Sequence, residues 1–171
     1  MSFLRFLMLV SLAVWIGGIT FFAFILAPAA FSVLPSFHIA GTIVGATLVR
    51  LHWMGIACGV VFLACSFIIE WANTGRLRVF AVGNVLFYLM LALTCISQFV
   101  IIPRMETIRA SAGNIEALVL TNPLRAHFDK LHAASVRLES FVLILGLAVI
   151  YLTSRGLTLR SPVRTGSPVE A

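Results

Sequence analysis

Residues 121–153 read TNPLRAHFDKLHAASVRLESFVLILGLAVIYLT. The stretch begins with charged residues that suit a water-exposed helix and ends in an apolar run typical of a membrane span. Between the two ends lie polar side chains that the helix carries toward lipid: His132, Ser135, Arg137 and Glu139. An ionisable side chain at membrane depth costs several kcal/mol unless a partner or water compensates it, so this stretch predicts a functional site.

The composition is that of a membrane protein. Of the 171 residues, 61% are hydrophobic and 11% are charged, whereas a soluble domain of this size needs a more polar surface. A spanning helix needs about 20 apolar residues, so the length fits about four spans and no second domain. The net charge of +6 is scattered, without a basic run or zinc-finger spacing. Nucleic-acid binding is therefore excluded.

The apolar segments predict an all-α, antiparallel four-helix membrane bundle over residues 1–154. Its spans are expected at about 6–30, 51–72, 79–102 and 133–153. Residues 37–71 are too long for one span, at about 1.5 Å per residue. They form either one helix that projects beyond the membrane or a short helix followed by a span. Arg50 favours a break, and hence a short extra helix between spans 1 and 2.

Local signals predict where the helices bend, begin and end. Pro28 is expected to loosen the first span, and the third is expected to stop at Pro103. Ser36 is a suitable N-cap, and Pro123 is a good first helical residue. The Ser-, Pro-, Gly- and Arg-rich tail at 155–171 is expected to be disordered.

Small residues also lie four apart on the first span, at Ala13 and Gly17. This spacing predicts a close approach of another helix.

Polar residues recur on one helical face of the third span: Asn84, Tyr88, Cys95 and Gln98. They predict either a lining for a ligand, ion or cofactor, or hydrogen bonds that tie helices together.

In the last span, the apolar run after Glu139 is too short to cross a bilayer, so Glu139 must face protein or water. Its candidate partners are His132, Arg50, Arg137 and Gln98. The site is then a proton or cation relay, a polar-substrate site, or a structural ion pair.

His52 and His132 are expected near one membrane surface, where paired histidines can hold a haem iron. They are the candidate metal ligands, although interfacial histidines with ordinary hydrogen bonds are the simpler explanation. Met54, Cys58 and Cys65 share a face that suits copper(I) or ordinary core packing. Ser135 has His132 three residues earlier but no predicted triad or oxyanion hole, so no catalytic residue is assigned.

Several motifs together resemble a known family: WIGGITFFAF at 15–24, APAAF at 27–31, HIAG at 38–41 and FDKLHAAS at 128–135. In order and spacing they are similar to the transmembrane protein 205-like family, also called domain of unknown function 4149. The resemblance extends from about residue 5 to 153. It implies a four-span helical membrane protein without an established activity or cofactor. A looser similarity to copper-resistance D-like and protoporphyrinogen-oxidase-J-like proteins keeps a haem or copper hypothesis open by analogy.

The leading hypothesis is a non-enzymatic multi-pass membrane protein with a polar intramembrane site for transport or small-ligand binding. The site is predicted to be lined by His52, Asn84, Tyr88, Gln98, His132, Ser135 and Glu139. The alternatives are a haem- or copper-binding redox protein and a structural or assembly subunit. Predicted partners are the lipid bilayer and a second copy or another membrane protein. A location in the inner or plasma membrane is expected, and arginines in short segments near span ends predict that both termini are cytoplasmic.

Overall fold

The computed structural model describes residues 2–75, 82–113, 115–119 and 121–158. Their elements are all helical: α1 (Ser2–Phe21), η1 (Phe22–Leu26), α2 (Ala27–Val33), α3 (Phe37–Thr74), α4 (Val82–Ile96), η2 (Ser97–Ile101), α5 (Ile102–Ala112), η3 (Ile115–Ala117) and α6 (Pro123–Thr158). The π-helical segments η1 and η2 join their neighbours into continuous rods. Four helical rods are thus long and apolar enough to cross a membrane, and the all-α four-helix bundle is confirmed.

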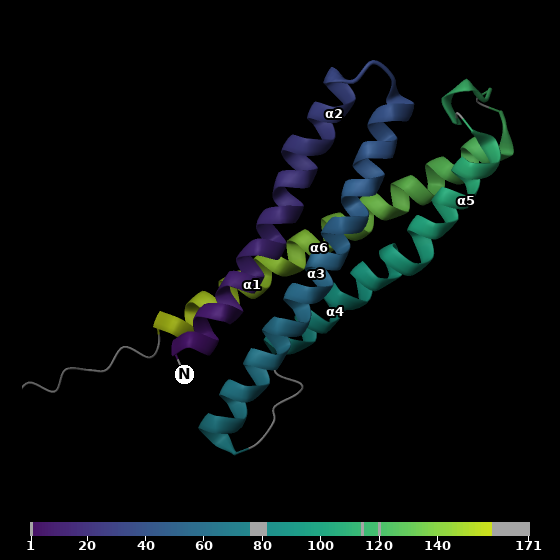
Figure 1. Cartoon of the computed structure of the whole chain (residues 1–171). Helices are drawn as coiled ribbons and strands as arrows, with labels where there is room; N and C mark the ends of the chain where they lie inside the picture. Colours follow the sequence, from purple (N-terminus) through teal and green to yellow (C-terminus); the bar gives the residue numbers. More distant parts are fainter. Residues whose placement is uncertain (1, 76–81, 114, 120, 159–171) are drawn as a thin grey trace, which may run out of the picture.

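The rods run antiparallel, and the bundle is wider at one end (Figure 1). At the end with the termini, the last turns of α6 pack beside the first turns of α1. At the other end, α2 and the first half of α3 lean away from α5 and the first half of α6. We call this the open end. It contains the α2–α3 turn and the connection from α5 to α6.

Aromatic rings fill the bundle on the side of the termini. The rings of Trp15 and Phe87 meet edge to face at 5.4 Å, and those of Phe62 and Phe87 stack at 4.0 Å. The three rings come from α1, α3 and α4, and Val142 of α6 is fully buried in the same cluster. Such ring pairs add about 0.5–1.5 kcal/mol each beyond the area they bury. The core therefore holds all four rods together below the open end.

The predicted short helix between spans 1 and 2 is wrong, because α3 is one unbroken helix of 38 residues. At 1.5 Å per residue it is about 57 Å long, so it extends past a hydrocarbon layer of about 30 Å. Arg50 does not break it, because its side chain is exposed and its guanidinium donates to the Ala46 carbonyl at 2.8 Å. The N-cap is confirmed, since the Ser36 hydroxyl accepts from the Ile39 amide. Gly75, with φ of 65°, ends the helix in the left-handed region that favours glycine.

The expected stop of the third span at Pro103 is also wrong, since the chain continues into α5. A π-helical turn precedes each proline: the Ala27 amide bonds to the Phe22 carbonyl, and the Ile102 amide to the Ser97 carbonyl. Pro28 and Pro103 then fall in the first turn of α2 and α5, where an amide donor is not required. The wider turns therefore let both rods pass a proline without ending.

The last helix begins at Pro123, as predicted, and the Asn122 side chain accepts from the Leu124 amide. Residues 155–158 belong to α6 rather than to a disordered tail. The rest of that predicted tail, 159–171, lies outside the described residues.

Candidate functional site

A buried histidine links three rods of the bundle. His52 of α3 is 1% exposed. Its Nδ1 lies 3.0 Å from the Gln98 Oε1 of η2, and its Nε2 lies 2.6 Å from the Glu139 Oε1 of α6. The Glu139 side chain is 13% exposed. We call these three residues the His52 triad.

The local structure explains why these side chains meet. Because α3 continues through Arg50, its buried face carries His52 together with Gly55, Gly59 and Phe62 toward the middle of the bundle. Gln98 lies inside the π-helical η2, whose buried residues are Ser97 and Gln98. A π-helical turn re-aims the side chains that follow it and often marks a functional position.

The hydrogen bonds determine how many protons the triad holds. An amide oxygen only accepts, so with the Gln98 oxygen toward Nδ1 this nitrogen carries a hydrogen. One proton then lies between Nε2 and the Glu139 carboxyl group. The pair is either imidazolium with carboxylate or neutral imidazole with carboxylic acid. In both forms its net charge is zero, which is the state that a low-dielectric interior tolerates.

A cavity of about 650 Å³ lies beside the triad, between the α2–α3 side and the α5–α6 side of the open end. Glu139 and Ser135 line it from α6, one helical turn apart. Most of the remaining lining is apolar and includes Phe22, Phe31, Phe37, Val44, Phe128 and Leu143. This volume and mixture of surfaces are typical of a small-molecule site.

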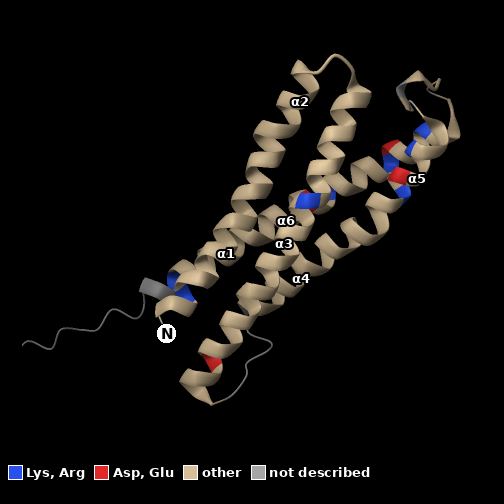
Figure 2. Ribbon diagram, viewed as in Figure 1, with Lys and Arg blue, Asp and Glu red and all other residues tan. Residues whose placement is uncertain are grey.

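Charged residues gather where the cavity reaches the open end, around α5 and the start of α6 (Figure 2). The Arg109 guanidinium is 2.6 Å from the Glu106 carboxylate and 5.4 Å from the centre of the Phe128 ring. It also lies against Gly45, where an added Cβ would be 3.4 Å from it. Arg109 therefore reaches α3 and α6 from α5, with its side chain 17% exposed.

The cavity is closed toward the termini. Beyond Gln98, the hydroxyl groups of Thr94 and Ser97 are buried without a hydrogen-bond partner among the described residues. Phe87 and Met90, both fully buried, come next along α4. Asn84 lies past this apolar layer and accepts a hydrogen bond from Ser66. The row of polar side chains along α4 and η2 is thus interrupted by an apolar layer.

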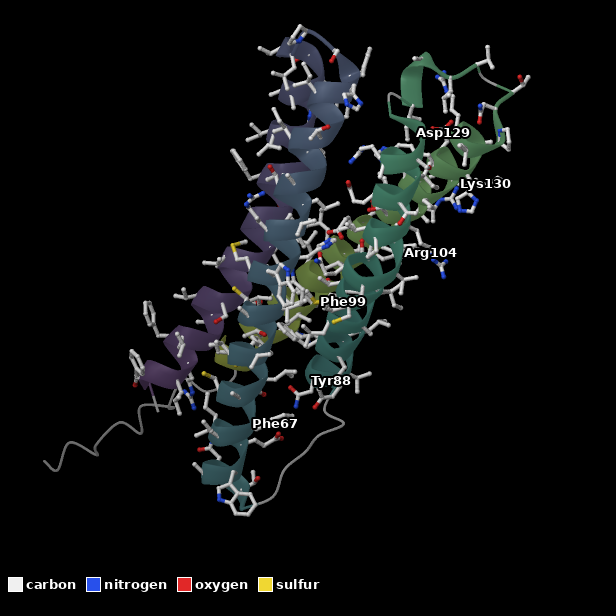
Figure 3. The ribbon with its side chains drawn as sticks, turned by 45° about the vertical axis from the view of Figure 1, so that its right-hand side comes forward. Phe67, Tyr88, Phe99, Arg104, Asp129 and Lys130 are labelled. Carbon is white, nitrogen blue, oxygen red and sulfur yellow. The ribbon has the colours of Figure 1, made fainter. Side chains whose placement is uncertain are left out.

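The structure divides the predicted site residues into two groups. It brings His52, Gln98 and Glu139 together and places Ser135 at the adjacent cavity. Asn84 and Tyr88 are not among the cavity residues, and Asn84 ties α4 to α3 instead. Tyr88 lies lower on α4, well away from Asp129 and Lys130 at the open end (Figure 3).

The predicted pair of His52 and His132 is not formed. His132 is exposed at the cavity, stacks on Phe128 at 6.4 Å and has no hydrogen bond within the described part of the chain. Both ring nitrogens of His52 already have partners, so the structure offers the haem hypothesis no axial pair.

No group of three or more His, Cys, Asp or Glu side chains suited to a metal occurs in residues 2–75, 82–113, 115–119 and 121–158. Of the proposed copper face, Met54 and Cys58 pack against the hydrophobic core.

Sequence reasoning did not find Glu106, Arg109 or Phe128 as site residues. Residues 104–122 have the composition of a polar loop, so the sequence did not indicate that Glu106 and Arg109 share a helix. The available signal was the pair Gly41 and Gly45 on α3, whose lack of side chains leaves room for the arginine.

The fold and the cavity define the chain as an integral membrane protein of four spanning helices with an internal pocket. It belongs to the family described as Domain of unknown function (DUF4149), whose model matches residues 10–114. The match extends from α1 through α5 and leaves out α6, which carries Glu139. The narrower label of transmembrane protein 205-like stays a prediction. No curated protein and no solved structure matches the chain.

Proposed function

We propose that this membrane protein binds a small, mostly apolar molecule in the cavity, with a polar group of the ligand placed against Glu139. The observation that carries the proposal is the direct contact between a cavity of about 650 Å³ and the buried pair of His52 and Glu139. Apolar walls with few polar groups at one point are the usual design of a ligand pocket.

The hydrogen bonding of Glu139 favours a role in ligand binding over a purely structural link between helices. Only its Oε1 takes part in a hydrogen bond with the described residues, yet the residue lines the cavity. Its second oxygen is therefore able to accept a hydrogen bond from a bound molecule. An ionised side chain at the centre of a membrane helix costs about 2.5–3.5 kcal/mol. A buried ion pair used only for packing is often matched in stability by apolar residues of similar size.

The shape favours binding from one side. The cavity extends to the open end, whereas the stacked rings of Trp15, Phe62 and Phe87 fill the bundle toward the termini. Among the described residues, the ring cluster therefore separates the cavity from the end with the termini. Transport through this site would require α1 and α4 to separate, which would break the ring contacts.

Filling the cavity is expected to abolish binding. Val44 lines the cavity, whereas its neighbour Ile43 is 45% exposed and is not among the lining residues. We expect Val44→Trp to weaken saturable binding of the neutral apolar fluorophore N-phenyl-1-naphthylamine by about tenfold or more, because the indole occupies the ligand's volume. Fluorescence titration of protein in nanodiscs, with empty nanodiscs subtracted, measures this.

Ile43→Trp is the matched control and should leave the affinity within about twofold, because its side chain points away from the cavity. Equal binding to the wild type and both variants would rule out this cavity as the binding site.

A further inference from the structure

Building on the proposed function, we infer that the ligand is a lipophilic cation and that its binding expels the single proton held between His52 and Glu139. The pocket then exchanges one cation for one proton. Three features of the structure carry this inference: the charges that line the cavity, its aromatic walls, and the neutrality of the pair.

At depth, the charged group that lines the cavity is Glu139, whose second carboxyl oxygen has no hydrogen bond among the described residues. The two arginines that line the cavity have partners toward the open end: Arg109 pairs with Glu106 at 2.6 Å, and Arg125 donates to the Leu118 carbonyl at 2.7 Å. Within the described part of the chain, the hydrogen-bond partner of Glu139 is His52, which contributes one removable proton. Once the shared proton is lost, the deep part of the cavity carries a negative charge and is complementary to a cation.

The walls suit a large, weakly hydrated cation. Phe22, Phe31 and Phe128 are among the lining residues. The face of an aromatic ring carries partial negative charge and attracts cations that have lost their water. Phe128 already holds the Arg109 guanidinium, 5.4 Å from its ring centre, so Phe22 and Phe31 are among the lining rings left for a ligand.

The zero net charge of the His52–Glu139 pair predicts that a bound cation replaces the shared proton. Before binding, His52 Nε2 and the Glu139 carboxyl group share one proton, and the pair has no net charge in either of its two forms. A cation placed against Glu139 adds a positive charge in a region of low dielectric. Loss of the shared proton leaves neutral His52 and a carboxylate paired with the ligand, so the net charge is again zero. The proton leaves through the open end, because the ring cluster closes the other side.

The charge of the ligand determines how many protons the pair releases or takes up on binding. A neutral molecule would leave the shared proton in place. An anion beside Glu139 would require the uptake of a further proton. The remaining titratable and charged groups that line the cavity, within the described residues, come from α3, α5 and α6: His38, Glu106, Arg109, Arg125, Asp129 and His132. Glu106, Asp129 and His132 are exposed, so salt and water screen their effect on the pair.

The test is isothermal titration calorimetry of the full-length purified protein at one pH, in two buffers of different ionisation enthalpy. The probes are tetraphenylphosphonium, which carries a permanent charge and no proton, and neutral N-phenyl-1-naphthylamine. The buffer dependence of the heat gives the number of protons released. We expect about one proton released per tetraphenylphosphonium bound and none with the neutral probe.

Glu139→Gln should weaken tetraphenylphosphonium binding by about tenfold or more and remove the proton release, because the charged acceptor is lost. A helical circular dichroism spectrum with a cooperative thermal transition shows that the variant folds. Lys130→Gln is the matched control: it removes an exposed charge from the same helix, at a residue that does not line the cavity, and should change neither affinity by more than about twofold.

Binding of tetraphenylphosphonium without proton release, or with unchanged affinity in Glu139→Gln, would overturn the inference. If the neutral probe still binds and Val44→Trp abolishes that binding, the proposed function stands even then. If neither probe binds the wild type, both are wrong.

Discussion

Replacing His52 with leucine is expected to lower the free energy of unfolding by about 3 kcal/mol, because one partner of a buried pair is left without compensation. The loss is expected to be large since His52 bonds to Gln98 at 3.0 Å and to Glu139 at 2.6 Å, so both partners lose a hydrogen bond at once. Unfolding in mixed detergent micelles with increasing dodecyl sulfate, followed by circular dichroism, measures the difference.

Two further variants separate this effect from a general loss of packing. The double change His52→Leu with Glu139→Leu should recover at least half of the lost stability, because the unpaired carboxyl group is gone. His132→Leu should change the stability by less than about 0.5 kcal/mol, since that ring is exposed. If the two single leucine substitutions at His52 and Glu139 simply add, the coupling inferred here does not exist.

Gly55→Ala is expected to destabilise the protein by about 2 kcal/mol through overpacking. A Cβ at Gly55 would overlap the Trp15 indole, with Cε2 at 2.7 Å and Cδ1 at 2.9 Å. The ring is rigid and itself 1% exposed, so it has nowhere to move without disturbing Phe87. A lower apparent melting temperature of the purified protein reports the effect.

Gly17→Ala is the matched substitution, because no atom lies within 4 Å of the Cβ it would add. It should be neutral or slightly stabilising, since alanine favours helix more than glycine does. Equal losses at the two positions would show that glycine matters here through the backbone rather than through contact between α1 and α3.

This comparison also corrects the predicted helix contact on the first span. The spacing of Ala13 and Gly17 suggested a close approach there, but both residues are exposed. The close approach occurs one residue along, at Gly18, where an added Cβ would be 2.7 Å from Met54. Small residues at a spacing of four indicate that helices can approach closely, but they do not reveal which helix face does so.

The partner of Glu139 shows which contacts of the site can be predicted from the sequence and which cannot. The sequence predicts that Glu139 faces protein or water, with Gln98 among its candidate partners, and places His52 in the same site. His52, however, was assigned to His132 rather than to Glu139. The two paired residues are 87 positions apart in the chain. Their contact depends on α3 remaining helical through Arg50, and the composition of that segment favoured a break.

Composition and hydropathy alone determined that this is a membrane protein of four antiparallel helices, because each span must satisfy its own backbone and meet about 30 Å of hydrocarbon. The chain also showed that Glu139 must be shielded, since isolated charge in lipid is costly. Only the tertiary structure decided which groups shield it and that a cavity lies beside them. Those outcomes depend on the rotation of each helix and on the splay of the open end, which are set by packing between distant residues rather than by local sequence.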